Sequence, residues 1–174
     1  MAEMTEEQRR VLSYMRAQGA KLSPSELVDK VRVAMDDLRA ALFAIPSARF
    51  DERPGPDDWS ANEVMAHVVK AGALFGGGIR RVLDGGVAGR PLEDRLETGA
   101  PTHTAAEWWE TFSRDRSALF ERVARAAPDA HLDGAIEHAM FGRLNWRETL
   151  LFLRVHDIDH AGQLKKIAAA LSAG

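Results

Sequence analysis

Three histidines in the sequence stand at positions from which they could bind one metal ion. His156 and His160 form an H-x-x-x-H pair, and residues four apart on a helix project from the same face with Cβ atoms about 5–6 Å apart. That separation allows both imidazoles to reach one ion at about 2.0–2.1 Å. His67 lies in or beside a second apolar stripe and would supply a third ligand from a facing helix. The set predicts a three-histidine site with an open position, as in catalytic metal sites.

The plainer interpretation is that these residues are hydrogen-bonded core histidines. A lone histidine on an apolar face is usually of that kind, and H-x-x-x-H pairs also occur by chance. Three buried imidazoles without partners would, however, each lose solvation worth about 1–3 kcal/mol, and one shared ion would remove that cost for all three. Because an all-imidazole set suits Zn, Ni, Cu or Fe, the sequence leaves the identity of the metal open.

Other polar side chains near the histidines have two interpretations each. Glu63, one turn before His67, could support the metal or act in catalysis, but it also stands three residues after Ser60 as in a helix cap. Asp157 shares the inward face of its helix and could orient an imidazole or act as a base. Gln163 either lines the pocket or is a surface amide.

The remaining titratable candidates are interpreted more simply. Asp159 is expected to be a solvated acid at the edge of its helix. His103, His131 and His138 are expected to lie in loops or beside a helix cap, although His138 could approach the mouth of a pocket. None of them has a spacing that specifies a metal ligand.

Five capping boxes mark where helices should begin. In this device a Ser, Thr or Asn side chain and a Glu or Gln three residues later satisfy two backbone donors at a helix start. Each is followed by helical periodicity or by a helix-permissive segment, so the five together are much stronger evidence than one. The pairs are Thr5 with Gln8, Ser23 with Glu26, Ser60 with Glu63, Thr104 with Glu107, and Asn145 with Glu148.

Four long stretches carry apolar residues at spacings of three and four, and no strand pattern of comparable strength competes with them. Four amphipathic helices of about 20 residues must pair their apolar stripes to remove them from water. The stripes are Leu27, Val31, Met35, Leu38, Leu42 and Ile45; Val64, Val68, Ala71, Phe75, Ile79 and Val82; Trp108, Phe112, Leu119, Val123 and Ala126; and Leu150, Leu153, His160, Leu164, Ile167 and Leu171.

The connections between these helices differ in length. Residues 46–59 and 128–144 contain prolines and glycines and are expected to be loops. Residues 84–103 are expected to form a longer crossover between the second and third helices of the bundle. A crossover of this kind changes which helices are neighbours, and long loops often border a functional site.

These elements predict an all-α fold of one domain. A four-helix bundle is expected over residues 23–174, preceded by an N-terminal helical extension over residues 1–22 that holds one short extra helix. A chain of 174 residues is long enough to bury a sizeable core.

Composition excludes several classes of function. The formal net charge of -3 leaves no excess of positive charge to neutralise phosphates, so nucleic-acid binding is not expected. The absence of cysteine removes disulfides, thiolate ligands and a cysteine nucleophile. The acidic N-terminus does not resemble a secretory signal, and no run approaches the roughly 18 apolar residues that would span a bilayer. We therefore expect a cytoplasmic protein without membrane partners.

Two segments resemble the DinB-like family of metalloproteins. The first, DDWSANEVMAHVV at residues 57–69, is similar to the W-S-x-x-E-V-x-x-H signature that opens the second helix of the family. The second, FGRLNWRETLLFLRVHDIDHAGQL at residues 141–164, is similar to its closing motif, G-x-L followed by H-x-x-x-H-x-x-Q-L. With compatible helix spacing between the two, the resemblance covers residues 23–171.

The resemblance implies a metal site and a class of chemistry. In the family, the histidine after W-S-x-x-E and both histidines of H-x-x-x-H hold one divalent metal ion, and these positions correspond to His67, His156 and His160. The family includes S-transferases and isomerases that use low-molecular-weight thiols such as mycothiol or bacillithiol. It implies an ion that activates a thiol as a Lewis acid, with the long crossover shaping the pocket for a second small-molecule substrate.

Two other functions stay open at this point. One is metal-dependent hydrolysis, with a bound hydroxide in place of the thiolate. The other is a non-catalytic metal-binding or stress-response protein. A homodimer is also expected, both from the resemblance and because the adjacent Trp108 and Trp109 should leave one aromatic ring near the surface.

Overall fold

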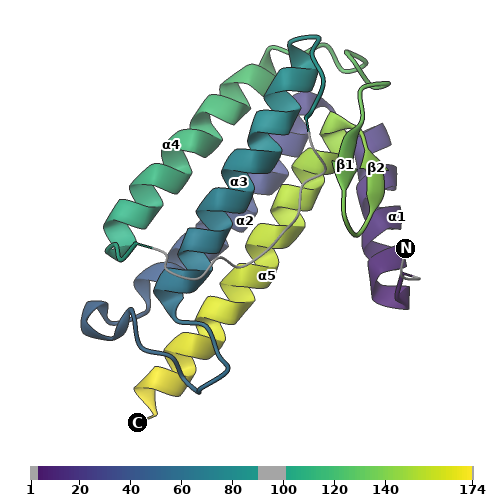
Figure 1. Ribbon diagram of the computed structural model, residues 1–174. Helices are drawn as coiled ribbons and strands as arrows, with labels where there is room; N and C mark the ends of the chain where they lie inside the picture. Colours follow the sequence, from purple (N-terminus) through teal and green to yellow (C-terminus); the bar gives the residue numbers. More distant parts are fainter. Residues whose placement is uncertain (1–3, 90–100, 174) are drawn as a thin grey trace.

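The computed structural model describes residues 4–89 and 101–173, and their elements are five α-helices, one 3₁₀ turn and one short β-hairpin (Figure 1). The helices are α1 (Glu6–Lys21), α2 (Pro24–Phe43), α3 (Ala61–Leu83), α4 (Ala105–Ala124) and α5 (Trp146–Ser172); the 3₁₀ turn is η1 (Ser47–Arg49), and the strands are β1 (Ile136–His138) and β2 (Gly142–Leu144).

All five predicted capping boxes are confirmed at the starts of the five α-helices. At α2, for example, the backbone N–H of Glu26 donates to Ser23 Oγ over 3.3 Å, and the N–H of Ser23 donates to the Glu26 carboxylate over 2.8 Å. Pro24 follows this cap inside the first turn, where its missing N–H costs nothing. The helix starts are therefore fixed by local sequence.

Helices α2 to α5 form the predicted four-helix bundle. Helix α2 packs against α4 and α5, and α3 packs against the same two helices from the other side. Helices α2 and α5 run in one direction and α3 and α4 in the other (Figure 1), so the connection between α3 and α4 is a crossover, as predicted. Helix α1 lies outside this square and packs on α5.

The predicted stripes meet in the centre of the bundle. All their members are buried except Ala126, which follows α4 and is partly buried. Three charged residues are also buried among the described helices: Arg116 on α4, and Arg147 and Asp157 on α5. Among the helices of the described part of the chain, none is both long enough and apolar enough to span a bilayer.

The prediction that residues 128–144 form only a loop is wrong, because they contain the β1–β2 hairpin. Ile136 pairs with Leu144 and His138 with Gly142 in antiparallel register, and Gly142 closes the turn at φ 68°. That left-handed conformation favours glycine after a three-residue hairpin loop. Each strand has only three residues, too few for an alternating pattern to be recognised in the sequence.

Arg147 holds α1 against the bundle through hydrogen bonds. Its side chain is buried at the start of α5, and Nε donates to the carbonyl of Gly19 over 2.6 Å. The two terminal nitrogens donate to the carbonyls of Leu22 and Pro128. One guanidinium thus satisfies carbonyls at the end of α1, in the following turn and in the loop before the hairpin.

We expect Arg147→Ala to destabilise the protein by about 2–4 kcal/mol, because charged hydrogen bonds to three carbonyls are lost together. Amide exchange should rise in residues 6–21 more than in α3 or α4. Chemical denaturation and hydrogen exchange measure the two effects. Arg143→Ala is the matched control, since Arg143 lies nearby on β2 with 71% of its side chain exposed. Equal losses in the two variants would contradict the role given to Arg147.

Candidate metal centre

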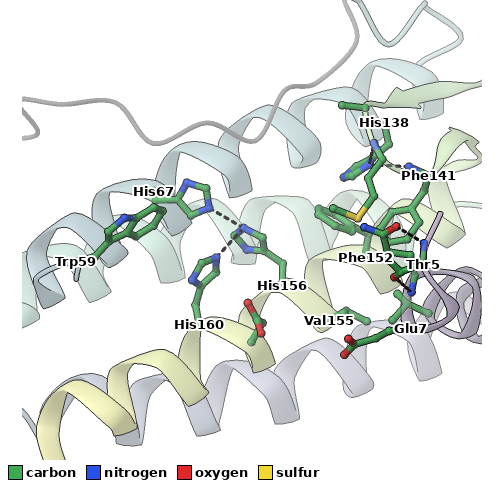
Figure 2. A pocket seen from close by; sticks show the side chains of 15 residues that line it. Thr5, Glu7, Trp59, His67, His138, Phe141, Phe152, Val155, His156 and His160 are labelled. Atoms are coloured by element: carbon green, nitrogen blue, oxygen red, sulfur yellow. Dashed lines mark hydrogen bonds between the residues drawn. The ribbon is translucent and has the colours of Figure 1, made fainter. Parts of the chain in front are cut away.

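The structure brings the imidazoles of His67, His156 and His160 together inside the bundle. His67 comes from the second turn of α3, and the other two come from the middle of α5 (Figure 2). The Nε2 atom of His156 lies 3.2 Å from Nε2 of His67 and 3.2 Å from Nε2 of His160. All three side chains are buried, at 6–7% exposure.

Gln163 sets the proton position on one of these rings. Nδ1 of His160 lies 2.9 Å from Oε1 of Gln163, one turn further along α5. Because an amide oxygen only accepts, Nδ1 carries the proton in the neutral ring and Nε2 presents its lone pair to His156. Gln163 thus contacts a candidate ligand and orients it, as outer partners of metal-binding histidines do. It does not line the cavity beside the cluster.

The geometry of the cluster fits a small divalent cation. Two nitrogens about 2.05 Å from one ion at a tetrahedral angle would be about 3.3 Å apart, close to the observed 3.2 Å. A single ring nitrogen carries either one proton or one lone pair, so Nε2 of His156 cannot form good hydrogen bonds to both neighbours at once. A cation accepts lone pairs from all three rings. The three buried histidines could therefore hold a metal ion.

A cavity of about 730 Å³ opens beside the cluster, which is within the usual range for small-molecule sites. Trp59, just before α3, packs edge-on against His67 with ring centroids 5.3 Å apart and lies parallel to the ring of His160 at 6.5 Å. On the other side of the cluster, the ring centroid of Phe152 lies 5.7 Å from that of His156. The rings of Trp59 and Phe152 thus flank the cluster beside the cavity.

Burial and, to a smaller extent, the neighbouring His156 lower the pKa of His160 to about 4. The ring is therefore neutral at pH 7, which is the protonation state that a metal ligand requires.

This pKa predicts how metal-free protein responds to acid. The unfolded ring titrates near 6.5 and the folded ring near 4, so the unfolded state binds more protons between those values. The stabilising contribution of the neutral His160 ring is then fully present above pH 6.5. The free energy of unfolding falls by about 3 kcal/mol as the pH drops toward 4, and this group does not reduce it further below pH 4. Urea denaturation of chelator-treated protein measures the change. A His160→Gln variant should lack this component; an identical pH dependence in the variant would contradict the prediction.

Glu63 lies outside the group of converging ligands. Its carboxylate accepts from the backbone N–H of Ser60 over 2.8 Å and from the guanidinium of Arg53. Burial raises the pKa of this carboxyl, but the bonds from Arg53 and Ser60 outweigh it, and the net shift is downward. The carboxylate is therefore engaged at the start of α3, as the capping interpretation predicts.

Asp157 faces the core and pairs with Arg116 of α4. Oδ1 accepts from Nη2 of Arg116 over 2.8 Å, and both side chains are at most 2% exposed. Burial raises the pKa of Asp157, while the charge of Arg116 opposes that rise. The second oxygen of Asp157 and two nitrogens of Arg116 have no hydrogen-bond partner. The aspartate is on the inward face, as expected, but its partner is an arginine that sequence reasoning did not identify.

Other residues of the cavity were predicted only as an alternative or not at all. His138 is buried on β1, where Nδ1 accepts from the backbone N–H groups of Met140 and Phe141 at 3.1 and 3.2 Å. Its ring contacts Phe152 at 4.4 Å between centroids and it lines the cavity, so the alternative that His138 approaches a pocket describes it better than the favoured role as a loop residue. Phe152 is four residues before His156, and this helical spacing could have identified it as a neighbour of the site.

Part of the predicted pocket lies outside the described residues. The crossover was expected to shape the second substrate's pocket, but its residues 90–100 are not among those that the structure describes. Among the described residues, the cavity is lined by α1, the hairpin, Trp59, His67 of α3 and α5.

Comparisons with known proteins agree with this architecture. A family model described as the DinB superfamily matches residues 30–164. The crystal structure of TT2238, described as a four-helix bundle protein, matches with a TM-score of 0.58 and 21% sequence identity, over 87% of this chain and 100% of that one. At that identity the likeness concerns the fold alone. Among curated proteins, none matches the chain.

Proposed function

The chain belongs to the DinB superfamily, and we propose that it is a divalent-metal-dependent enzyme with thiol-dependent S-transferase or isomerase chemistry at His67, His156 and His160. The observation that carries the proposal is the convergence of three buried Nε2 atoms at the edge of a cavity. A structural metal site would be closed by a fourth protein ligand. Here the three imidazoles leave room for a substrate atom.

Each part of the site has a physical role in this proposal. A bound divalent ion would supply Lewis-acid chemistry, lowering the pKa of a thiol or polarising a carbonyl. Gln163 holds the lone pair of His160 toward the ion site through its bond to Nδ1. Trp59 and Phe152 flank the imidazoles, and their rings keep the reacting atoms in a partly dry environment, where electrostatic effects are stronger than in water.

The state of the nearby carboxylates favours a thiol over hydrolysis. Water bound to a divalent ion has a pKa of about 7 and is only partly ionised at neutral pH, so a hydrolase often adds a general base that takes the proton from the attacking water. Glu63 is bound to Arg53, and Asp157 is bound to Arg116. A thiol whose pKa has fallen below the ambient pH is already a nucleophile and needs no such base. Among the described residues that line the cavity, Asp159 is the acid next in sequence to the cluster, beside His160, and the hydrolase alternative depends on it.

Parallel assays of one preparation test the proposal. Protein purified without a histidine tag or chelator is analysed for bound metal and then assayed for thiol–electrophile conjugation and for ester and amide hydrolysis. We expect conjugation that is lost with chelator and restored by metal, and that survives Asp159→Asn. Chelator-sensitive hydrolysis that is lost in Asp159→Asn would favour the hydrolase instead. Metal retention without turnover in either assay would favour the non-catalytic alternative.

We also propose that the protein forms a homodimer through the α2–α4 face. Trp108 is buried, whereas Trp109 is half-buried and Phe43 is 49% exposed. The guanidinium of Arg39 lies 5.6 Å from the Trp109 ring and 5.7 Å from the Phe43 ring, so these residues form one aromatic and cationic surface. Sedimentation should show a dimer at tens of micromolar and a monomer for Phe43→Glu; a monomeric parent protein would remove the proposal.

A further inference from the structure

One wall of the cavity comes from outside the part of the chain that the superfamily model matches. Helix α1 spans Glu6–Lys21, whereas the match begins at residue 30. Four residues at and after the start of α1 nevertheless line the same cavity as the three histidines: Thr5, Glu7, Gln8 and Val11. The N-terminal segment therefore belongs to the binding site as well as to the scaffold.

The middle of this cavity is apolar. Phe141 from the hairpin, Phe152 and Val155 from α5, and Val11 from α1 contribute carbon surfaces. Figure 2 shows the three imidazoles at one end of the view and Thr5 and Glu7 at the other, with Phe152 and Val155 between them. A ligand that starts at the histidines and extends toward α1 must therefore pass along apolar side chains.

The charges around the cavity have one sign. Of the described residues that line it, the formally charged ones are Glu7 and Asp159, both exposed acids. Thr5 and Gln8 are held in the cap of α1 by reciprocal hydrogen bonds of 2.8 and 3.2 Å, so this end of the helix is ordered. Arginine and lysine, the residues that recognise carboxylate or phosphate, are absent from the described lining.

We propose that α1 selects the ligand of this site: a molecule with a metal-binding head, an apolar body and a far end that is uncharged or positively charged. The head is the part that rests on the proposed metal function. The apolar body packs on Val11 and the phenylalanines, and the far end reaches Glu7. Ligands that carry a carboxylate at that end are disfavoured by the like charge of Glu7 and by the absence of a described cationic partner.

Alkyl hydroxamates test the proposal without any assumption about the reaction. The hydroxamate head binds divalent metals, and the tail can be varied. Acetohydroxamate, octanohydroxamate and the terminal amino and carboxy derivatives of octanohydroxamate are titrated calorimetrically into zinc-loaded full-length protein. Octanohydroxamate should bind at least about tenfold more tightly than acetohydroxamate, because its chain buries several additional methylene groups. The amino derivative should bind at least about fivefold more tightly than the carboxy derivative.

Two variants on the same helix turn isolate the contribution of α1. Glu7→Gln should reduce the preference for the amino over the carboxy derivative by about twofold to threefold. Glu6→Gln removes the same charge next door and should leave the preference unchanged, because Glu6 lies outside the cavity and pairs with Arg10. Val11→Asp should weaken octanohydroxamate without changing acetohydroxamate.

The outcomes separate this inference from the proposed function. If the protein retains zinc and binds acetohydroxamate, but all tails bind alike or the carboxy derivative binds best, the role of α1 is overturned while the metal site stands. If Glu6→Gln and Glu7→Gln change the preference equally, the selection is a general charge effect and the inference also fails. If zinc is not retained, the proposed function fails and the inference falls with it.

Discussion

Replacing His156 by alanine is expected to reduce zinc affinity by more than about 100-fold, a larger loss than removal of an outer-shell partner causes. His156 is the central ring of the cluster, since its Nε2 lies 3.2 Å from the corresponding atoms of both His67 and His160. Without it, the two remaining imidazoles come from different helices and no longer share a neighbour. Calorimetric titration of chelator-treated protein with zinc, together with metal analysis of the purified variant, measures the loss.

A second readout follows from linkage between binding and folding. A ligand that binds only the native state stabilises it by about 2.7 kcal/mol at a concentration 100 times its dissociation constant. Zinc should therefore raise the melting temperature of the parent protein but not of His156→Ala. His103→Ala is the matched control, because His103 is also a histidine but packs on Trp108 outside the cluster. If His156→Ala binds zinc as tightly as the parent protein, the cluster does not hold the metal, and its members are ordinary core histidines.

Most of the fold could be predicted because its signals are local. A capping box such as Asn145 with Glu148 involves residues three apart, and the structure confirms its hydrogen bonds at 2.9 and 3.0 Å. The convergence of His67 with the α5 pair follows from the same logic. Once two helices must face each other with their apolar stripes, a polar residue within a stripe is carried into the shared interior.

Some residues of the site could not be predicted, because tertiary contacts set their positions or because they lie in elements too short to give a sequence pattern. The wall made by α1 could not be predicted, because α1 is positioned by Arg147 hydrogen bonds to distant carbonyls. The hairpin strands are too short for periodicity. Arg116, by contrast, had a usable signal: it is four residues after Phe112 and three before Leu119, so it occupies a position of the buried α4 stripe. A charged residue at such a position predicts a buried counter-charge.

That counter-charge, Asp157, is the basis of the second large effect. Asp157→Ala is expected to cost about 3–5 kcal/mol of unfolding free energy, because it leaves the Arg116 guanidinium buried without a compensating charge. For a chain of this size the melting temperature should fall by about 10 °C. The 2.8 Å ion pair is fully inside the protein, so solvent and salt screen it little. Equilibrium denaturation in urea measures the loss.

A double variant distinguishes a structural pair from a catalytic aspartate. Arg116→Met with Asp157→Leu replaces both charges by apolar groups of similar length, and such replacements of buried ion pairs are often neutral or stabilising. We expect this double variant to recover most of the stability that Asp157→Ala loses and to bind zinc like the parent, since neither residue belongs to the cluster. A stable double variant with impaired zinc binding would instead make Asp157 a positioning residue for His156, its neighbour in sequence. A double variant as unstable as Asp157→Ala would contradict the ion-pair explanation, because the cost would then come from packing around α4 and α5 rather than from an unpaired charge.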